Sequence, residues 1–192
     1  MLVCASTVEA RCVDVVDVAI ELPHHFVTPN NTGVSYFYDL EKEEYFVSWA
    51  KNGHRGGPYG PFTLTPGCAT ATIKWESNEY LLLTSGCGTF CWYVLALPLT
   101  KNTKNYIKID RPLAFDGTRN LLAYYHAKDI IRVKNLITGQ QQEFRTAYEC
   151  ESASGLCFHD VRFTDTSLEY IWWYDPDEQP LSVLLEARLF SN

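Results

Sequence analysis

The feature of the sequence that most constrains the fold is a recurring order, in which a short polar segment is followed directly by an apolar, strand-like segment. The apolar segments begin near Val34, Tyr80, Leu121 and Leu168, and are therefore 46, 41 and 47 residues apart. The polar segments before them are residues 30–33, 76–79, 116–120 and 164–167. Steps of about 40–47 residues, with several strands in each unit, are typical of the blades of β-propellers.

Strand-like segments fill most of the chain, and helical signals are scarce. Aromatic residues make up 14% of the sequence, which favours pleated, half-buried surfaces. No window keeps an apolar stripe of helical period between recognisable caps. We expect strands over residues 13–22, 34–38, 44–49, 73–75, 80–84, 92–97, 106–109, 121–125, 130–135, 143–147, 168–174 and 181–189. Residues 184–189 fit a short terminal helix equally well, because Leu, Glu, Ala and Arg favour one.

These patterns predict an all-β fold, built as a small β-propeller-like structure of about four repeated strand units. A β-sandwich is the alternative, because turns every 8–12 residues or so give a similar rhythm. No break in composition marks a domain boundary, so residues 11–192 are expected to form a single domain.

Residues 1–10 stand apart from this pattern. Val8-Glu9-Ala10 fits the small-x-small motif of a signal-peptidase site, although the apolar stretch before it is short and no basic region precedes it. We interpret residues 1–10 as the remnant of a signal peptide. The mature chain is then expected to be secreted or periplasmic, and Cys4 is lost with the leader.

The remaining cysteines are Cys12, Cys68, Cys87, Cys91, Cys150 and Cys157. Six cysteines in an exported chain indicate a disulfide framework, which has 15 possible pairings. The alternative is a cytosolic chain with reduced cysteines in its core, because free Cys also buries readily. The spacing of the six cysteines favours Cys87 with Cys91 and Cys150 with Cys157, each pair closing a turn or a loop. Cys12 and Cys68 then remain for a long-range bridge.

The net charge of the chain restricts the class of partner. Sixteen basic and 23 acidic residues give a charge of −7 at pH 7. Such a surface repels nucleic acid and anionic membranes and suits a basic protein partner, and the alternative is that the charge serves solubility alone. No apolar run approaches the roughly 20 residues that a membrane-spanning helix needs, so no membrane insertion is expected.

The segment around Cys87 and Cys91 is the most specific local motif. Glycines on both sides of Cys87 allow the backbone dihedral angles of a tight, disulfide-closed loop. A preorganised loop loses little entropy on binding. We therefore expect binding residues at Ser85, Gly88, Thr89 and Phe90. A purely structural staple between two strands is the other interpretation.

The segment Gly86-Cys87-Gly88-Thr89-Phe90-Cys91 resembles the Gly-Cys-Gly-x-x-Cys segment of a group of exported bacterial proteins of largely unknown function. Trp92 stands where that group has Gln, and residues 97–100 replace its Asp-containing turn. The resemblance implies export and β structure. In size, cysteine content, acidic charge and the loop of residues 85–90, the chain is also similar to small periplasmic immunity proteins that neutralise peptidoglycan-cleaving effectors. This similarity implies an inhibitor or immunity role.

A second stretch, residues 51–61, holds four Gly and two Pro around a His-Arg pair. That density of Gly and Pro predicts an extended surface loop. Arg and Tyr are enriched at interfaces, so His54, Arg55 and Tyr59 are further candidate binding residues. A simple connection between two strand units is the alternative.

Motifs for catalysis are missing from the sequence. It has no Gly-x-Ser-x-Gly elbow, no His-Glu-x-x-His and no Gly-rich phosphate loop. Adjacent His24 and His25 would point to opposite faces of a strand, and no second cysteine pair has zinc-finger spacing. We therefore predict no catalytic residue, metal or cofactor. The expected function is that of an exported, disulfide-stapled binding protein, and the alternative is a carbohydrate-active or other hydrolase using loop carboxylates.

Overall fold

The protein is described by a computed structural model covering residues 24–39, 41–63, 71–88, 91–100, 105–150, 157–172 and 181–185. Within these ranges every regular element is a β-strand, which confirms the expected all-β class. The same residues contain no helix of the length and apolar character that would cross a membrane.

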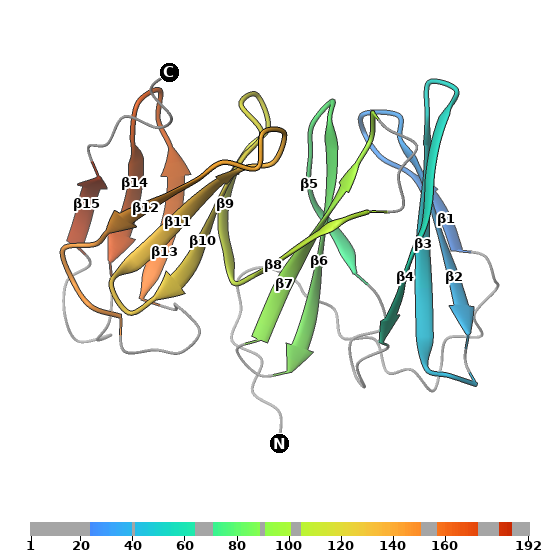
Figure 1. The fold of residues 1–192 in the computed structure, drawn as a ribbon, viewed down its shortest axis with the longest axis horizontal. Coiled ribbons are helices and arrows are strands. Elements are labelled where there is room, and N and C mark those ends of the chain that lie inside the picture. The colour runs from blue at the N-terminus through green and yellow to red at the C-terminus, as the bar shows by residue number, and fades with distance from the viewer. Residues whose placement is uncertain are drawn as a thin grey trace.

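The strands form antiparallel sheets, each built from strands that are consecutive in the sequence (Figure 1). The first sheet contains β1 (His24–Val27), β2 (Gly33–Asp39), β3 (Glu44–Lys51) and β4 (His54–Thr63). The second contains β5 (Thr72–Glu76), β6 (Tyr80–Gly88), β7 (Cys91–Pro98) and β8 (Ile107–Asp110).

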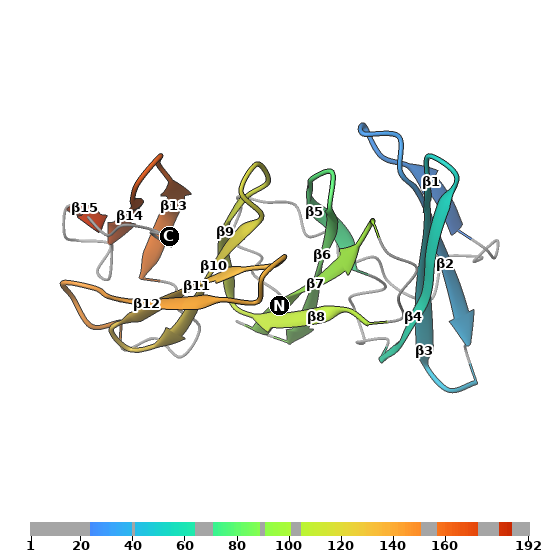
Figure 2. The same ribbon diagram turned by 45° about the horizontal axis from the view of Figure 1, so that its top comes forward.

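The third sheet contains β9 (Pro112–Asp116), β10 (Leu121–Ala127), β11 (Ile130–Asn135) and β12 (Gln141–Arg145). The fourth is described by β13 (Phe158–Phe163), β14 (Leu168–Trp172) and β15 (Leu181–Leu185). The four sheets stand side by side in sequence order, from right to left in Figure 1, and Figure 2 shows the same row. The row does not close into a ring, because the first and fourth sheets lie at its two ends.

Each pair of neighbouring sheets encloses its own apolar core. The first and second sheets bury Tyr36 and Val47 against Leu81 and Leu83. The core of the second and third sheets contains Leu82, Val94, Ala96, Ile109, Leu122 and Leu136. The core of the third and fourth sheets contains Leu121, Ala123, Tyr125, Phe158, Leu168 and Tyr170, among others.

The run Leu81-Leu82-Leu83 shows why the middle sheets are apolar on both faces. Successive side chains of a strand point to opposite faces, so Leu81 and Leu83 pack toward the first sheet and Leu82 toward the third. All three side chains are fully buried. A strand covered on both faces therefore has a continuous apolar sequence, whereas β2 in the outer sheet alternates buried Val34 and Tyr36 with partly or fully exposed positions.

The predicted repeat corresponds to a real structural equivalence. The segments expected to begin near Val34, Tyr80, Leu121 and Leu168 are β2, β6, β10 and β14, the second strand of each sheet. The polar segments before them form the turns that enter these strands from β1, β5, β9 and β13. Three of those first strands were not expected, namely β1, β9 and β13. Each is short and is interrupted by His, Pro or Asp, which weakens the alternating pattern.

The expectation of an extended surface loop at residues 51–61 is wrong. Asn52 and Gly53 form a two-residue turn with φ of 48° and 78°, the left-handed values that tight hairpins require, and the chain continues as β4. The glycines of β4 are needed for packing. A Cβ on Gly56 would lie 2.2 Å from Trp49 Nε1, and Gly57 has a φ of +101° beside the backbone of Val47.

One of the predicted disulfides lies fully within the described residues and is present. Cys150 and Cys157 form a disulfide bond beside the third and fourth sheets, as expected. The backbone of Cys87 lies at a register shift of β6, one residue before Gly88, which pairs with Cys91 at the start of β7. Cys12, Cys68, the expected strand at 13–22 and the leader interpretation of residues 1–10 all lie outside the described residues.

Candidate functional site

Hairpin turns from three sheets surround a hollow with a volume of about 720 Å³, which we call the hairpin-tip groove. The β1–β2 and β3–β4 turns of the first sheet contribute one side of it, and the β5–β6 and β9–β10 turns contribute the rest. Its lining consists of Asn30, Lys51, Asn52, Glu76, Ser77, Asn78, Glu79, Gly117, Thr118 and Asn120. The groove therefore lies along the edge of the row that is formed by the turns leading into the second strand of each sheet.

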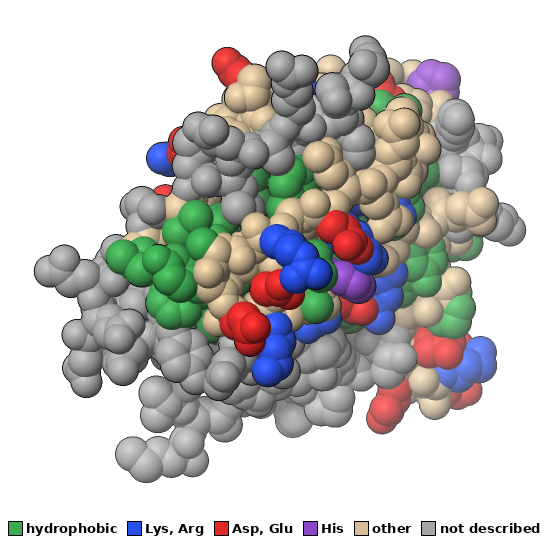
Figure 3. All heavy atoms as spheres, turned by 60° about the vertical axis from the view of Figure 1, so that its left-hand side comes forward, with side chains coloured by type: hydrophobic (Ala, Val, Ile, Leu, Met, Phe, Trp, Pro, Cys, Tyr) green, Lys and Arg blue, Asp and Glu red, His purple; other side chains and the backbone are tan. Residues whose placement is uncertain are grey.

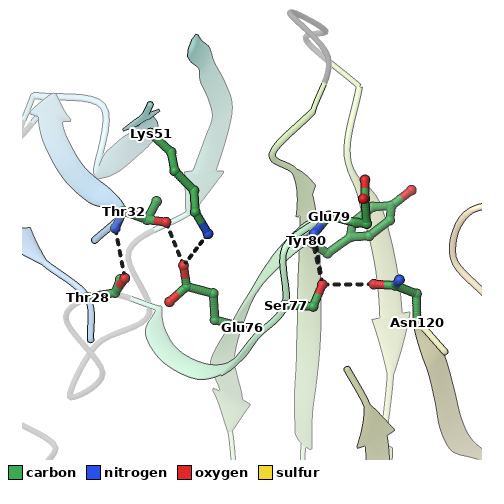
Figure 4. Close-up of polar contacts among 8 residues, drawn as sticks. All are labelled: Thr28, Thr32, Lys51, Glu76, Ser77, Glu79, Tyr80 and Asn120. Atoms are coloured by element: carbon green, nitrogen blue, oxygen red, sulfur yellow. Dashed lines mark hydrogen bonds and ion pairs between the residues drawn. The ribbon is translucent and has the colours of Figure 1, made fainter. Parts of the chain in front are cut away.

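Glu76, the last residue of β5, fastens the first sheet to the second. Its Oε1 accepts a hydrogen bond from Thr32 Oγ1 at 2.5 Å and lies 3.3 Å from Lys51 Nζ (Figure 4). The side chains of Lys51 and Glu76 are only 12% and 5% exposed. Thr32 is itself held by its backbone N–H, which donates to Thr28 Oγ1 at 3.0 Å. One carboxylate thus joins two turns of the first sheet to β5.

Ser77 fastens the second sheet to the third. Its Oγ accepts hydrogen bonds from the backbone N–H groups of Glu79 and Tyr80 at 3.1 and 3.0 Å. The single hydroxyl proton of Ser77 is therefore left to donate to Asn120 Oδ1, 2.8 Å away (Figure 4). Because a hydroxyl has only one proton, this arrangement fixes which end of the Asn120 carboxamide faces Ser77.

Arg119 fastens the third sheet to the fourth. Its Nη1 and Nη2 donate to the backbone carbonyls of Asp165 and Thr164 at 2.7 and 2.6 Å. Its Nε donates to the Asp116 carboxylate at 2.5 Å. Partial burial acts to raise the pKa of Asp116, but hydrogen bonds from the backbone and side chain of Arg119 hold that pKa below its usual value.

These three contacts occupy equivalent places in the fold. Each one links the turn that enters the second strand of one sheet to the same turn of the next sheet or to its immediate flank. Together they hold the hairpin tips in fixed relative positions. The groove is therefore preformed rather than assembled from independent loops.

Tyr80 lies at the edge of the groove but belongs to the frame. Its hydroxyl donates to the backbone carbonyl of Leu136 at 2.6 Å. Burial, together with the nearby Glu79 carboxylate, raises the pKa of this hydroxyl. Burial also raises the pKa of Tyr36 and Tyr45, which lie in the core of the first and second sheets. These shifts are consequences of packing.

The candidate binding residues at 51–61 differ in exposure, because two lie on the surface and one lies in the core. His54 and Arg55 are exposed and follow the Asn52–Gly53 turn, so they stand beside the groove. Tyr59 is only 1% exposed, and its hydroxyl accepts a hydrogen bond from Trp49 Nε1 at 3.1 Å. The expectation that Tyr59 is displayed for binding is wrong, because its side chain is part of the core.

The candidates near Cys87 lie at the other end of the second sheet. β6 starts at Tyr80, next to the groove, and ends at Gly88, a strand length of about 27 Å at 3.3–3.4 Å per residue. Ser85 is buried, and Thr89 and Phe90 lie outside the described residues. Of the described candidates, Ser85 and Gly88 therefore lie toward the far end of β6 from the turn that His54 and Arg55 follow.

Sequence reasoning missed the residues that line the groove. The polar segments at 76–79 and 116–120 mark its position in the sequence, but their residue types are those of ordinary turns. Lys51 carries no local signal at all, since its partner Glu76 is 25 residues away. The available clue was that equivalent polar segments recur at one end of every strand unit.

A concentration of charge on the third sheet is a different kind of feature. Figure 3 shows side chains of both signs gathered near the middle of one face. Arg132 Nε donates to Glu143 Oε1 at 3.1 Å and its Nη2 contacts His126 Nε2 at 2.8 Å, while Arg145 pairs with Asp129 at 2.6 Å. These are paired charges on and beside the edge strand β12, a composition that discourages edge-to-edge association.

Histidine, cysteine and carboxylate side chains do not gather into a set of three or more fit to hold a metal ion anywhere in the described ranges. His25 instead contacts Ser35 Oγ through its Nδ1 at 2.9 Å. Comparison of the chain with protein-family models, with curated proteins and with solved structures finds no match. The functional assignment therefore depends on the groove and on the fold that builds it.

Proposed function

We propose that this chain is an exported binding protein. It recognises a protein partner through the edge of its row of sheets where the hairpin-tip groove lies. The observation that carries the proposal is the hairpin-tip groove, which polar contacts hold open across the junctions between sheets. A preformed surface loses little conformational entropy when a partner docks. Binding therefore suits this geometry.

The rim of the groove supplies the contacts for such a partner. Asn30, Asn52 and Asn78 are exposed on three separate turns, and His54 and Arg55 extend the same edge of the first sheet. Arg is among the residue types enriched at interfaces. The net charge of −7 favours a basic partner, because opposite charges accelerate encounter.

Export and an inhibitor or immunity role are part of the proposal. The Cys150–Cys157 bond supports export, since disulfides persist mainly in oxidising compartments. A secreted or periplasmic binder that acts by covering its partner needs a rigid surface, not catalytic groups. The edge of the row at the hairpin-tip groove has that character.

We also propose that the four sheets are the blades of a propeller-like fold. Three of them are four-stranded meanders in sequence order, and their entering turns are equivalent. Each core lies between neighbouring sheets. A β-sandwich has two packed sheets, so a row of four with three successive cores fits that architecture less well.

The hydrolase alternative has less support from the groove. A glycosidase of the usual kind needs two carboxyl groups, one of which acts as a free acid. Glu76 accepts a hydrogen bond from Thr32 and is paired with the Lys51 ammonium. This leaves Glu79 as the one carboxylate of the lining that is not paired in this way, whereas the usual glycosidase mechanism uses two carboxyl groups.

Affinity capture from the native source with the intact chain tests the proposal. Two variants make the test specific to the surface. Asn78→Trp places a bulky ring at an exposed tip beside the groove, and Glu41→Trp places the same ring in the exposed β2–β3 turn at the opposite end of the first sheet. Moderate ionic strength keeps charge steering active.

We expect one stoichiometric protein partner that is recovered by the wild type and by Glu41→Trp but not by Asn78→Trp. Equal recovery by all three chains would place the interface elsewhere and overturn the proposal. Turnover of a glycan or peptide by the purified chain would favour the hydrolase instead.

A further inference from the structure

The lining of the hairpin-tip groove is made of polar side chains and one glycine, and contains no apolar side chain. The groups that dominate protein–protein affinity are mostly aromatic residues and arginine seated in closely packed, desolvated pockets. An apolar anchor from a partner would find nothing to pack against in this groove. The group that enters it must therefore gain its affinity from hydrogen bonds.

Lys51 and Glu76 present a donor and an acceptor side by side. An ammonium group has three N–H donors, and Lys51 Nζ uses one of them on Glu76 Oε1. That same Oε1 also accepts from Thr32, so both contacts of the carboxylate fall on one oxygen and Oε2 keeps its capacity to accept. Since both residues line the groove, the remaining N–H donors of Lys51 and the Oε2 acceptor of Glu76 are available to a ligand bound there.

Asn120 adds an oriented donor. Its residue is only 5% exposed, and its Oδ1 is occupied by the Ser77 hydroxyl. The amide Nδ2 with its two protons has no contact among the described residues, and the side chain lines the groove. A buried carboxamide held in one orientation is a specific donor rather than a solvated surface group.

The charge of the lining selects against anionic ligands. Lys51 offsets Glu76 across 3.3 Å, which leaves the Glu79 carboxylate as the uncompensated charge of the lining. A phosphate or carboxylate ligand would be repelled by the Glu79 carboxylate. A neutral ligand whose groups both donate and accept hydrogen bonds satisfies the whole set.

Hydroxyl groups on adjacent carbons have this property. Each hydroxyl donates one hydrogen bond and accepts others, so one can accept from Lys51 or Asn120 while its neighbour donates to Glu76 or Glu79. The groove, at about 720 Å³, lies within the range of roughly 300–1,000 Å³ that holds small ligands. It has room for a small saccharide.

We infer that the hairpin-tip groove binds a neutral saccharide unit of the partner. The inference rests on the proposed function, because it assigns a chemistry to the same surface. The saccharide belongs to the glycan of that protein partner. Its vicinal hydroxyls are recognised by Lys51, Glu76 and Asn120.

Titration of the isotope-labelled full chain, followed by backbone amide NMR, tests the inference with defined probes. The probes are glucose, galactose, mannose, N-acetylglucosamine and their β-linked disaccharides, with inorganic phosphate and free lysine for comparison. We expect saturable shifts confined to the groove lining for at least one saccharide, at concentrations up to about 10 mM, where weak single-site binding is measurable.

Two variants make the result specific. Asn120→Asp keeps an oxygen for the Ser77 hydroxyl but removes the amide donor, and a roughly tenfold loss of affinity is expected, as for the loss of one hydrogen bond to a bound ligand. Asn78→Trp, at an exposed position, should abolish saccharide binding without disturbing the core. Glu41→Trp, at the opposite end of the first sheet, should bind as the wild type does.

The outcomes separate this inference from the proposed function. If no saccharide shifts the groove residues and a captured protein partner survives enzymatic deglycosylation, the inference is overturned and the proposed function stands. Shifts caused by phosphate or lysine alone overturn the neutral ligand class. A partner lost on deglycosylation supports the inference, whereas saccharide shifts without any captured protein partner point to a free polysaccharide and overturn the glycoprotein source. If no saccharide binds and no partner is captured, both proposals fail.

Discussion

The hydroxyl of Ser77 donates to Asn120 Oδ1 at 2.8 Å, and this single bond joins the hairpin tip of the second sheet to that of the third. The two residues are 43 positions apart and are 7% and 5% exposed. The Oγ of Ser77 also accepts hydrogen bonds from the backbone N–H groups of Glu79 and Tyr80. One small side chain therefore closes its own turn and positions a groove residue of the next sheet.

Substitution Ser77→Ala is expected to lower the free energy of unfolding by about 1–3 kcal/mol, because buried donors and acceptors lose their partner. Urea denaturation followed by tryptophan fluorescence measures the change. Thr118→Ala, in the exposed β9–β10 turn, is the control and should stay within about 0.5 kcal/mol of the wild type. Equal effects of the two substitutions would show that the contact between sheets contributes little.

Lys51→Met should destabilise the protein by about 1–3 kcal/mol, because it leaves the partly buried Glu76 carboxylate without its cation. The two side chains are 12% and 5% exposed, so the pair is partly buried at the groove. In the double variant Lys51→Met/Glu76→Gln no uncompensated charge remains, so stability should recover in part. A double variant that loses the full sum of the single effects would contradict this account of the pair.

Asp116 should give the wild type a component of stability that depends on pH. Its pKa in the folded protein lies below the ordinary value of 3.8. The charged carboxylate therefore stabilises the fold above about pH 4, and this stabilisation is lost as the pH falls through the folded-state pKa. The difference in unfolding free energy between the wild type and Asp116→Asn should be largest near pH 7.

Denaturation of both proteins at intervals between pH 7 and pH 2 measures this difference, which should shrink below about pH 4. Glu41→Gln, in the exposed β2–β3 turn, controls for the loss of one negative charge. A difference that stays constant over the whole range would mean that the Asp116–Arg119 pair does not set the acid sensitivity.

Gly56→Ala tests the reason for the unusual composition of β4. The added Cβ would lie 2.2 Å from Trp49 Nε1 and 2.6 Å from the Tyr59 hydroxyl. Overpacking of this kind costs about 1–3 kcal/mol, and the melting temperature should fall accordingly. Gly117→Ala, whose Cβ would make an ordinary contact at 3.4 Å, should change it little. A neutral Gly56→Ala would mean that the strand tolerates a side chain there.

The sequence patterns predict the second strands well because burial imposes a pattern along a single strand. The apolar run at Leu81–83 and the alternation in β2 are both visible without any knowledge of neighbours. β4 could not be recognised in the same way. Its glycines are required by the close approach of Trp49 and by the register shifts between β3 and β4. Both features belong to the neighbouring strand and cannot be seen in the sequence of β4 alone.

The candidate site was harder to predict than the fold because its parts come from separate turns. Lys51, Glu76 and Asn120 meet only when three sheets stand in register. Local chemistry marks each of them as an ordinary turn or strand-end residue. Conversely, Tyr59 and Ser85 have residue types suited to binding, yet the pleat of their strands turns both inward.

Because each core lies between sheets that are consecutive in the sequence, stability should be close to a sum of nearest-neighbour terms. Such arrays nucleate locally and add units in succession. The second and third sheets each have two neighbours, whereas the described parts of the first and fourth have one. Native-state hydrogen exchange should accordingly be slowest at the centre of the row and faster at both ends, so that the protein unfolds from its outer sheets inward.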